Sequence, residues 1–191
     1  MNTMSISPMK SKTTSSTDEC CPKFDPSSFT DADGNPYKII TWNEKPFVKD
    51  GTWCFCYVPL AFGRATTRAL KKIKDAGAES PKDEFMILSD CKSPWYSDFV
   101  SVAKDDVKGA TVEKISGDFL AKAFEGDYSN IGTWVKEMKA LLKEVLEKKA
   151  KDENTPAVDV EDTRVLFYYP TCPKCAKKYG ENYVVVLAKM P

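Results

Sequence analysis

The sequence predicts an α+β fold in which a strand–helix–strand–strand unit occurs twice. The first observation is an internal repeat, because residues 51–67 recur in degraded form at residues 117–133, with Trp53 at the position of Phe119. The second is that each copy opens as an alternating, aromatic-rich strand, continues into a helix and is followed by two more strand-like runs. Such a tandem duplication predicts an antiparallel sheet with two helices on one face and a ligand groove between the halves.

The repeat also sets the expected domain boundaries. Residues 1–18 are rich in Ser, Thr and Lys, a composition typical of a disordered lead. Residues 19–50 are predicted to be an N-terminal extension. The remaining residues, 51–191, are expected to form one domain with repeats at about 51–104 and 111–189.

The first repeat follows a short predicted edge strand at Tyr37–Trp42. The run Thr52–Val58 alternates aromatic residues with cysteines, which is the period of a strand, and Pro59 ends it. The helix that follows is expected to end near Ala76, because Gly77 can adopt the left-handed conformation of a C-terminal cap. Its predicted buried stripe is mostly small: Phe62, Ala65, Ala69, Ile73 and Ala76.

Apolar runs predict the strands that complete the first repeat and open the second. Phe85–Ser89 and Asp98–Ala103 are joined by a loop that carries Trp95. Thr111–Ile115 and Phe119–Phe124 are expected to be the opening strands of the second copy.

A long helix and two more strands complete the second repeat. Asp127 or Ser129 can cap the helix. Its predicted core stripe recurs at helical spacing: Ile131, Trp134, Val135, Met138, Leu142 and Val145. Residues 151–162 are predicted to be a loop, and Arg164–Tyr169 and Tyr183–Ala188 the last strands, the latter central in the sheet.

Composition excludes several classes of function. Lysine plus arginine equals aspartate plus glutamate, with 28 of each, so the sequence predicts no nucleic-acid partner. No apolar run is long enough to cross a membrane. Seven cysteines without a secretory signal predict a reduced, cytoplasmic protein. Because the sequence has no histidine, any catalysis would depend on Asp, Glu, Tyr, Lys or Cys side chains.

The second copy contains Gly117-Asp-Phe-Leu-Ala-Lys-Ala-Phe-Glu-Gly-Asp-Tyr128, followed by a helix with Trp134. This resembles the GyrI-like (gyrase-inhibitor-like) small-molecule-binding family, in which a glycine-led strand ends in a Gly-Pro-Tyr turn before the second helix. The chain is also similar to small microbial proteins of this type, often described as hydrolases. They share its Cys-Cys-Pro-Lys-Phe start, at residues 20–24, and its Cys-Pro-Lys-Cys end, at residues 172–175.

The resemblance implies a concave, aromatic-lined surface between the two halves. Such surfaces bind flat, apolar and often cationic organic molecules, and some members of the family hydrolyse reactive compounds. The partner expected for this chain is therefore a small hydrophobic or planar organic molecule. The alternative is that the same residues are ordinary core aromatics. The implied lining residues are Trp53, Phe55, Tyr57, Trp95, Phe119, Phe167 and Tyr169.

The sequence departs from the family in two places. Asp127 stands where the family turn has proline. The family's drug sensors and hydrolases carry a buried glutamate on the strand after the second helix, and the matching position here is Leu166 or Phe167. The missing acid leaves open whether the chain is an enzyme. Acidic residues near other predicted strand ends could replace it: Glu84, Asp90 and Glu125.

The cysteines suggest a second kind of site. Cys172 and Cys175 have the spacing of a metal-binding or redox pair, and their predicted place in a loop favours metal. A zinc ion held by four thiolates would need Cys20 and Cys21 as well. Reduced thiols without metal, and a disulfide pair, are the alternatives.

Two further function classes stay open at this stage. The chain could be a metal- or thiol-containing interaction protein whose aromatic residues are only core. It could also be a tetrapyrrole carrier of the SOUL-like type, which shares a related duplicated fold. The absence of histidine argues against axial haem ligation but not against stacking on a porphyrin.

Overall fold

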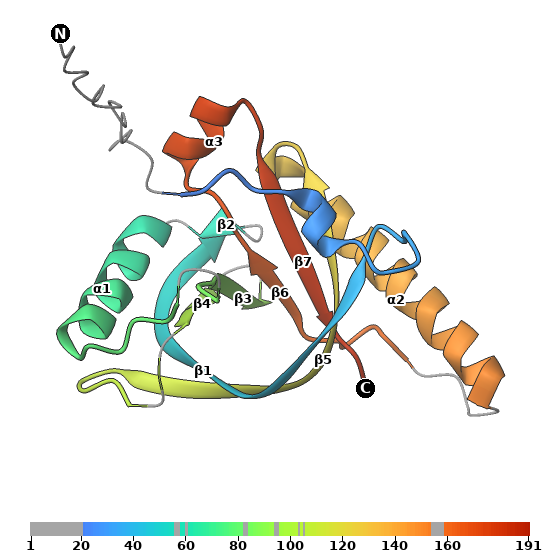
Figure 1. Cartoon of the computed structure of the whole chain (residues 1–191), viewed down its shortest axis with the longest axis horizontal. Coiled ribbons are helices and arrows are strands. Elements are labelled where there is room, and N and C mark those ends of the chain that lie inside the picture. The colour runs from blue at the N-terminus through green and yellow to red at the C-terminus, as the bar shows by residue number, and fades with distance from the viewer. Residues whose placement is uncertain are drawn as a thin grey trace, which may run out of the picture.

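A computed structural model describes residues 21–55, 58–59, 61–81, 84–93, 96–102, 104, 106–153 and 159–191. The chain has an α+β fold (Figure 1). Its elements follow the order η1 (Pro26–Phe29), β1 (Lys38–Phe55), β2 (Val58–Pro59), α1 (Phe62–Asp75), β3 (Ile87–Ser93), β4 (Tyr96–Val102), β5 (Thr111–Glu125), η2 (Tyr128–Asn130), α2 (Ile131–Glu153), β6 (Val165–Tyr168), α3 (Pro173–Tyr179) and β7 (Tyr183–Lys189).

The sheet closes on itself. Its strands follow the order β2-β1-β4-β3-β6-β7-β5, and β1 also pairs with β5. All of these pairings are antiparallel, so every strand except the short β2 has a hydrogen-bonded neighbour on each side. In Figure 1, β1 and β5 curve around together and complete the closure. Closure leaves the strands with few unpaired edges and gives the sheet an inner and an outer face.

The strand order is symmetric about the junction of β3 with β6. Outward from that junction the first half runs β3, β4, β1 and the second half runs β6, β7, β5. Each half contains one long strand, one long helix and then two more strands along the chain. In this order, the strand equivalent to β1 is β5, the strand equivalent to β4 is β7, and the strand equivalent to β3 is β6.

The inner face of the closed sheet is filled by apolar side chains. Among the residues whose side chains the structure describes, they come from β1, β3, β5, β6, β7 and η1. The interior core consists of Phe29, Trp42, Phe47, Leu88, Ile115, Phe119, Ala121, Leu166, Val185 and Leu187. Because side chains alternate along a strand, the residues between them face outward.

The two long helices cover the outer face at opposite sides of the molecule (Figure 1). On one side, Trp134, Met138 and Leu142 of α2 pack on β5, β6 and β7, and the Trp134 ring stacks on Phe124 at 5.6 Å. On the other side, Ala69 and Ile73 of α1 pack on Val48.

The small side chains of α1 let it lie close to the sheet, and Gly77 ends it as predicted. Ala65 and Ala69 are fully buried. Gly77 has φ +59°, and the Ala78 amide donates to the Ile73 carbonyl at 2.9 Å. This is the left-handed cap that a glycine supplies at little conformational cost.

Two expected pairs of strands are single strands in the structure. Tyr37–Trp42 and Thr52–Val58 were expected as separate strands, but β1 contains Lys38–Trp42 of the first and Thr52–Phe55 of the second, with a bulge after Trp42 and a left-handed Glu44 at φ +48°. The expected boundary at residue 51 therefore falls inside β1. β5 likewise continues through Gly117, which has φ +118°.

Among the described residues, none of the helices combines the length and apolarity needed to cross a bilayer.

Replacing Leu142 by alanine should lower the free energy of unfolding by about 2 to 5 kcal/mol, because the side chain is fully buried between α2 and the sheet. Its neighbour Lys143 is a matched control, since 64% of its side chain is exposed. Lys143→Ala should stay within about 0.5 kcal/mol of wild type. Equal effects of the two changes in urea unfolding would contradict the packing of α2.

Candidate functional site

Three cysteines come together at one end of the closed sheet. The sulfur atoms of Cys21, Cys172 and Cys175 all lie within 4.8 Å of one another, and none of the three is in a disulfide. Cys175 is buried, and the other two are half-buried. Of the four predicted metal ligands, Cys20 lies outside the described residues. The structure thus brings together the three that it describes.

The Cys172-Pro-Lys-Cys175 segment opens a short helix, where the sequence analysis expected a loop. Cys172 is the extended residue before α3, Pro173 is its first residue, and the Ala176 amide donates to the Cys172 carbonyl at 2.9 Å. Gly180 ends the helix with φ +70°. Proline and glycine resemble loop signals, but here they occupy the first position and the cap of a helix. This turn brings Cys175 round to the same side as Cys172.

The N-terminal extension reaches this helix through several contacts. The Cys172 amide donates to the Cys21 sulfur at 3.4 Å, and the Tyr179 hydroxyl donates to the Cys21 carbonyl at 2.6 Å. Phe24 packs on Tyr183 with ring centroids 5.3 Å apart, and on Phe29 at 5.8 Å. Because Phe29 belongs to the interior core, the extension closes this end of the sheet.

Tyr168 lies near the cluster, and its hydroxyl is a weaker acid than that of an ordinary tyrosine. Burial, followed by the nearby Cys21, raises the pKa of its hydroxyl above the usual value of 10.0. A tyrosine that donates a proton near neutral pH would need the opposite shift.

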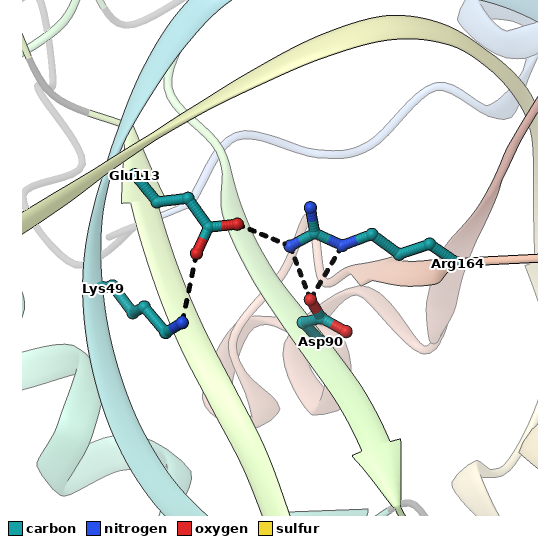
Figure 2. A network of polar contacts seen from close by, with 4 residues as sticks. All are labelled: Lys49, Asp90, Glu113 and Arg164. Carbon is teal, nitrogen blue, oxygen red and sulfur yellow. Dashed lines mark hydrogen bonds and ion pairs between the residues drawn. The ribbon is translucent and has the colours of Figure 1, made fainter.

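A network of four charged residues lies within the closed sheet (Figure 2). Arg164 donates to one oxygen of Asp90 through Nε at 2.8 Å and through Nη2 at 2.5 Å. Nη2 also donates to Glu113 at 2.8 Å, and Glu113 accepts from Lys49 at 3.1 Å. The network therefore joins β1, β3 and β5 to the residue that precedes β6.

Alternation along the strands explains why these charges share the inner face. Asp90 follows Leu88 by two residues, and Glu113 precedes Ile115 by two. Lys49 follows Phe47 in the same way along β1. The network thus adjoins the interior core.

The electrostatics of the network favour the charged forms of Glu113 and Arg164. Burial acts to raise the pKa of Glu113, but hydrogen bonds from Arg164 and Lys49 outweigh it and hold the pKa below its ordinary value of 4.5. Burial acts to lower the pKa of Arg164, but the charge of Asp90 and the hydrogen bond to Glu113 raise it. Asp90 is only 2% exposed, and its pairing with a guanidinium is what makes a buried carboxylate tolerable.

A surface hollow lies beside this network. Its volume is about 610 Å³, and Lys49 forms part of its wall. The other lining residues are Asp50, Gly51, Lys72, Gly109, Ala110 and Thr111. Arg68 and Asp50 form an ion pair at 2.9 Å on the outer face of β1, which fixes one edge of the hollow.

Of the seven predicted groove residues, those whose side chains the structure describes do not share one surface. Phe119 lies in the interior core, whereas Phe167 and Tyr169 pack beneath α2 on the outer face. Trp53 is 69% exposed. The Phe55 side chain and all of Tyr57 and Trp95 lie outside the described residues. Phe119 and Phe167 are separated because only alternate residues of each strand face inward.

Among the three acids considered as replacements, Asp90 is the buried one. Glu84 and Glu125 are exposed. Sequence reasoning missed Glu113, Arg164 and Lys49. The signal for Glu113 was its place in the strand-like run at residues 111–115, two positions from Ile115.

Comparison with known proteins identifies the family of this chain. The sequence over residues 11–190 matches the family model described as bacterial hydrolase. This chain belongs to that bacterial hydrolase family. None of the curated protein sequences matches it.

The solved structures that resemble this hydrolase-family chain include an uncharacterised conserved protein from Listeria innocua. The likeness covers 79% of this chain and 90% of the other, at 11% sequence identity and a TM-score of 0.48.

The wild-type protein should lose stability on acidification more steeply than a Glu113→Gln variant. Because the folded-state pKa of Glu113 is lowered, its contribution is present above about 4.5 and is lost as pH falls through the lower value. Urea unfolding between about pH 6 and pH 3 should therefore show the two proteins converging at low pH.

The control for this experiment is Glu161→Gln, since 81% of that side chain is exposed. It should follow the wild-type pH dependence closely. Parallel curves for wild type and Glu113→Gln would contradict the network.

Proposed function

We propose that this member of the bacterial hydrolase family binds a small hydrophobic or planar organic molecule beside the charged network around Arg164. We further propose that it hydrolyses a reactive compound of that kind. The observation that carries the proposal is the guanidinium of Arg164, held by Asp90 and Glu113 next to an apolar interior. Binding sites commonly combine apolar walls with a few fixed polar groups in this way.

The chemical role we assign to Arg164 is stabilisation of negative charge. Hydrolysis of an acyl or related bond builds negative charge on oxygen, and a fixed cationic donor stabilises it. In Figure 2, Nη1 of Arg164 points away from both carboxylates. Within the described part of the chain this nitrogen makes no hydrogen bond, so it is available to a bound molecule. The carboxylates hold the guanidinium in place.

The position of Asp90 supports a link to the GyrI-like resemblance. In the register of β3 with β6, Asp90 lies directly opposite Leu166, one of the two positions where the resemblance leads us to expect the family's buried glutamate. We therefore propose that the acid has moved to the neighbouring strand. Because Arg164 neutralises it, we expect neutral or anionic ligands rather than the cations that the family often binds.

The tandem duplication is proposed on the same basis. β4 and β7 take equivalent places in the strand order. The sequences around these two strands, residues 97–104 and 182–189, also match in hydrophobicity and in a closing Ala-Lys. The repeat also aligns Phe62, the first residue of α1, with Tyr128, the first residue of η2. Both agreements support a duplicated unit. Separately, we propose the reduced cytoplasmic location that the cysteines predict.

A metal- or thiol-containing interaction protein is the second candidate, and the cysteine cluster favours it. The two candidates differ in one respect. Removing metal should abolish the function of an interaction protein of this kind, whereas ligand binding at Arg164 should survive.

A panel of planar aromatic molecules with cationic, neutral or anionic groups, including a porphyrin, tests the proposal. Thermal melting and tryptophan fluorescence would measure binding. A ligand at a hundred times its Kd should add about 2.7 kcal/mol to the free energy of unfolding. We expect neutral or anionic members to bind, and hydrolysis of activated aryl esters to fall about a hundredfold to a thousandfold in Arg164→Lys. Lysine keeps the charge but loses the forked geometry.

The matched control is Arg68→Lys, because Arg68 also pairs with an aspartate but on the outer face. It should leave binding and hydrolysis at wild-type levels. The proposal fails if no class of molecule stabilises the protein, or if the two arginine variants behave alike.

A further inference from the structure

The geometry points to a second site, independent of the proposed function: a zinc ion held by the thiolates of Cys21, Cys172 and Cys175. The three sulfur atoms come from chain segments about 150 residues apart and still lie within 4.8 Å of one another. A Zn–S bond of about 2.3 Å in tetrahedral geometry places neighbouring sulfurs about 3.8 Å apart. An adjustment of about 1 Å or less therefore makes this cluster a coordination site.

The backbone around the cluster is arranged to support thiolates. The amide of Cys172 donates to the Cys21 sulfur at 3.4 Å. A hydrogen bond to a thiolate favours the charged form, which is the form that binds metal. The helical turn of α3 brings Cys172 and Cys175 together, and Cys21 approaches from the extension.

The donor set selects the metal. Three thiolates are soft ligands, which favour zinc over magnesium or calcium. The chain contains no histidine, so the fourth ligand is another cysteine, a carboxylate or a water molecule. Our proposal requires only the three described thiolates for binding.

The site would fasten the N-terminal extension to the domain. Residues 22–28 separate Cys21 from Phe29, whose ring is buried in the interior core. Some of the surrounding contacts are largely exposed, as with the Lys23–Glu181 ion pair at 3.0 Å, where 61% of the lysine side chain is exposed. Exposed pairs of this kind contribute little, whereas a metal that links distant segments contributes its binding energy to folding.

Metal analysis of the full chain, purified without chelators, is the direct test. Wild type should carry about one zinc per chain, and Cys21→Ser, Cys172→Ser and Cys175→Ser should each lose most of it. Cys91→Ser, at a cysteine of β3 that the proposed site does not include, should keep it. Cys20→Ser should also keep it, because three thiolates remain.

Cobalt substitution provides a readout that does not depend on variants folding well. Co²⁺ added to chelator-treated wild type should give sulfur-to-cobalt charge-transfer bands and the visible bands of a tetrahedral ion. Chelation should also speed tryptic cleavage after Lys23, and zinc should restore protection, because the metal holds the extension.

Three results would overturn the site. The first is wild-type protein without metal that also gives no charge-transfer bands with Co²⁺. The second is a Cys172–Cys175 disulfide in protein handled without reductant, together with no metal uptake after reduction. The third is loss of zinc from Cys20→Ser as complete as from Cys21→Ser. Since these measurements do not involve Arg164 or any organic ligand, they are distinguishable from failure of the proposed function.

Discussion

The pairing of β1 with β5 is the constraint on which the rest of the structure depends. It runs from Lys38 opposite Ala121 to Lys49 opposite Thr111, interrupted by one bulge. Without it, the strands would form an open sheet with two edges and no enclosed interior. With it, alternate residues of every strand face a shared core, and the charged side chains of β1, β3 and β5 come within hydrogen-bonding distance. The network of Arg164 is therefore a product of closure.

Much of the fold could be predicted from periodicity and caps. The alternation in the strands, the stripe on α2 and the cap at Gly77 each depend on residues close in sequence, and the structure agrees with them. The continuity of β1 could not be predicted, because Asn43, Glu44 and Pro46 resemble a turn. Asn43 and Glu44 instead form a bulge between Trp42 and Lys45, and the pairing with β5 on both sides of this bulge is a long-range property.

The candidate sites divide in the same way. The spacing of Cys172 and Cys175 marked a thiol site locally, and Cys21 was recognised because cysteine pairs stand out. Arg164, Glu113 and Lys49 carry no such mark, because isolated charges on strands usually face solvent. Which of the two faces of each strand becomes the inner face is decided only when the sheet closes. Two of the aromatic residues expected to line a groove, Phe119 and Phe167, fall on opposite faces for the same reason.

The place of β7 in the sheet bears on how the chain is synthesised. β7 lies between β5 and β6, and its residues Val184 to Ala188 are fully buried, although it is the last strand along this sequence. The ring of strands cannot be completed before β7 has been synthesised, so β5 and β6 each present an unpaired edge to the crowded cell until then. A chain truncated before Tyr183 would keep those edges permanently and would be prone to aggregate through them.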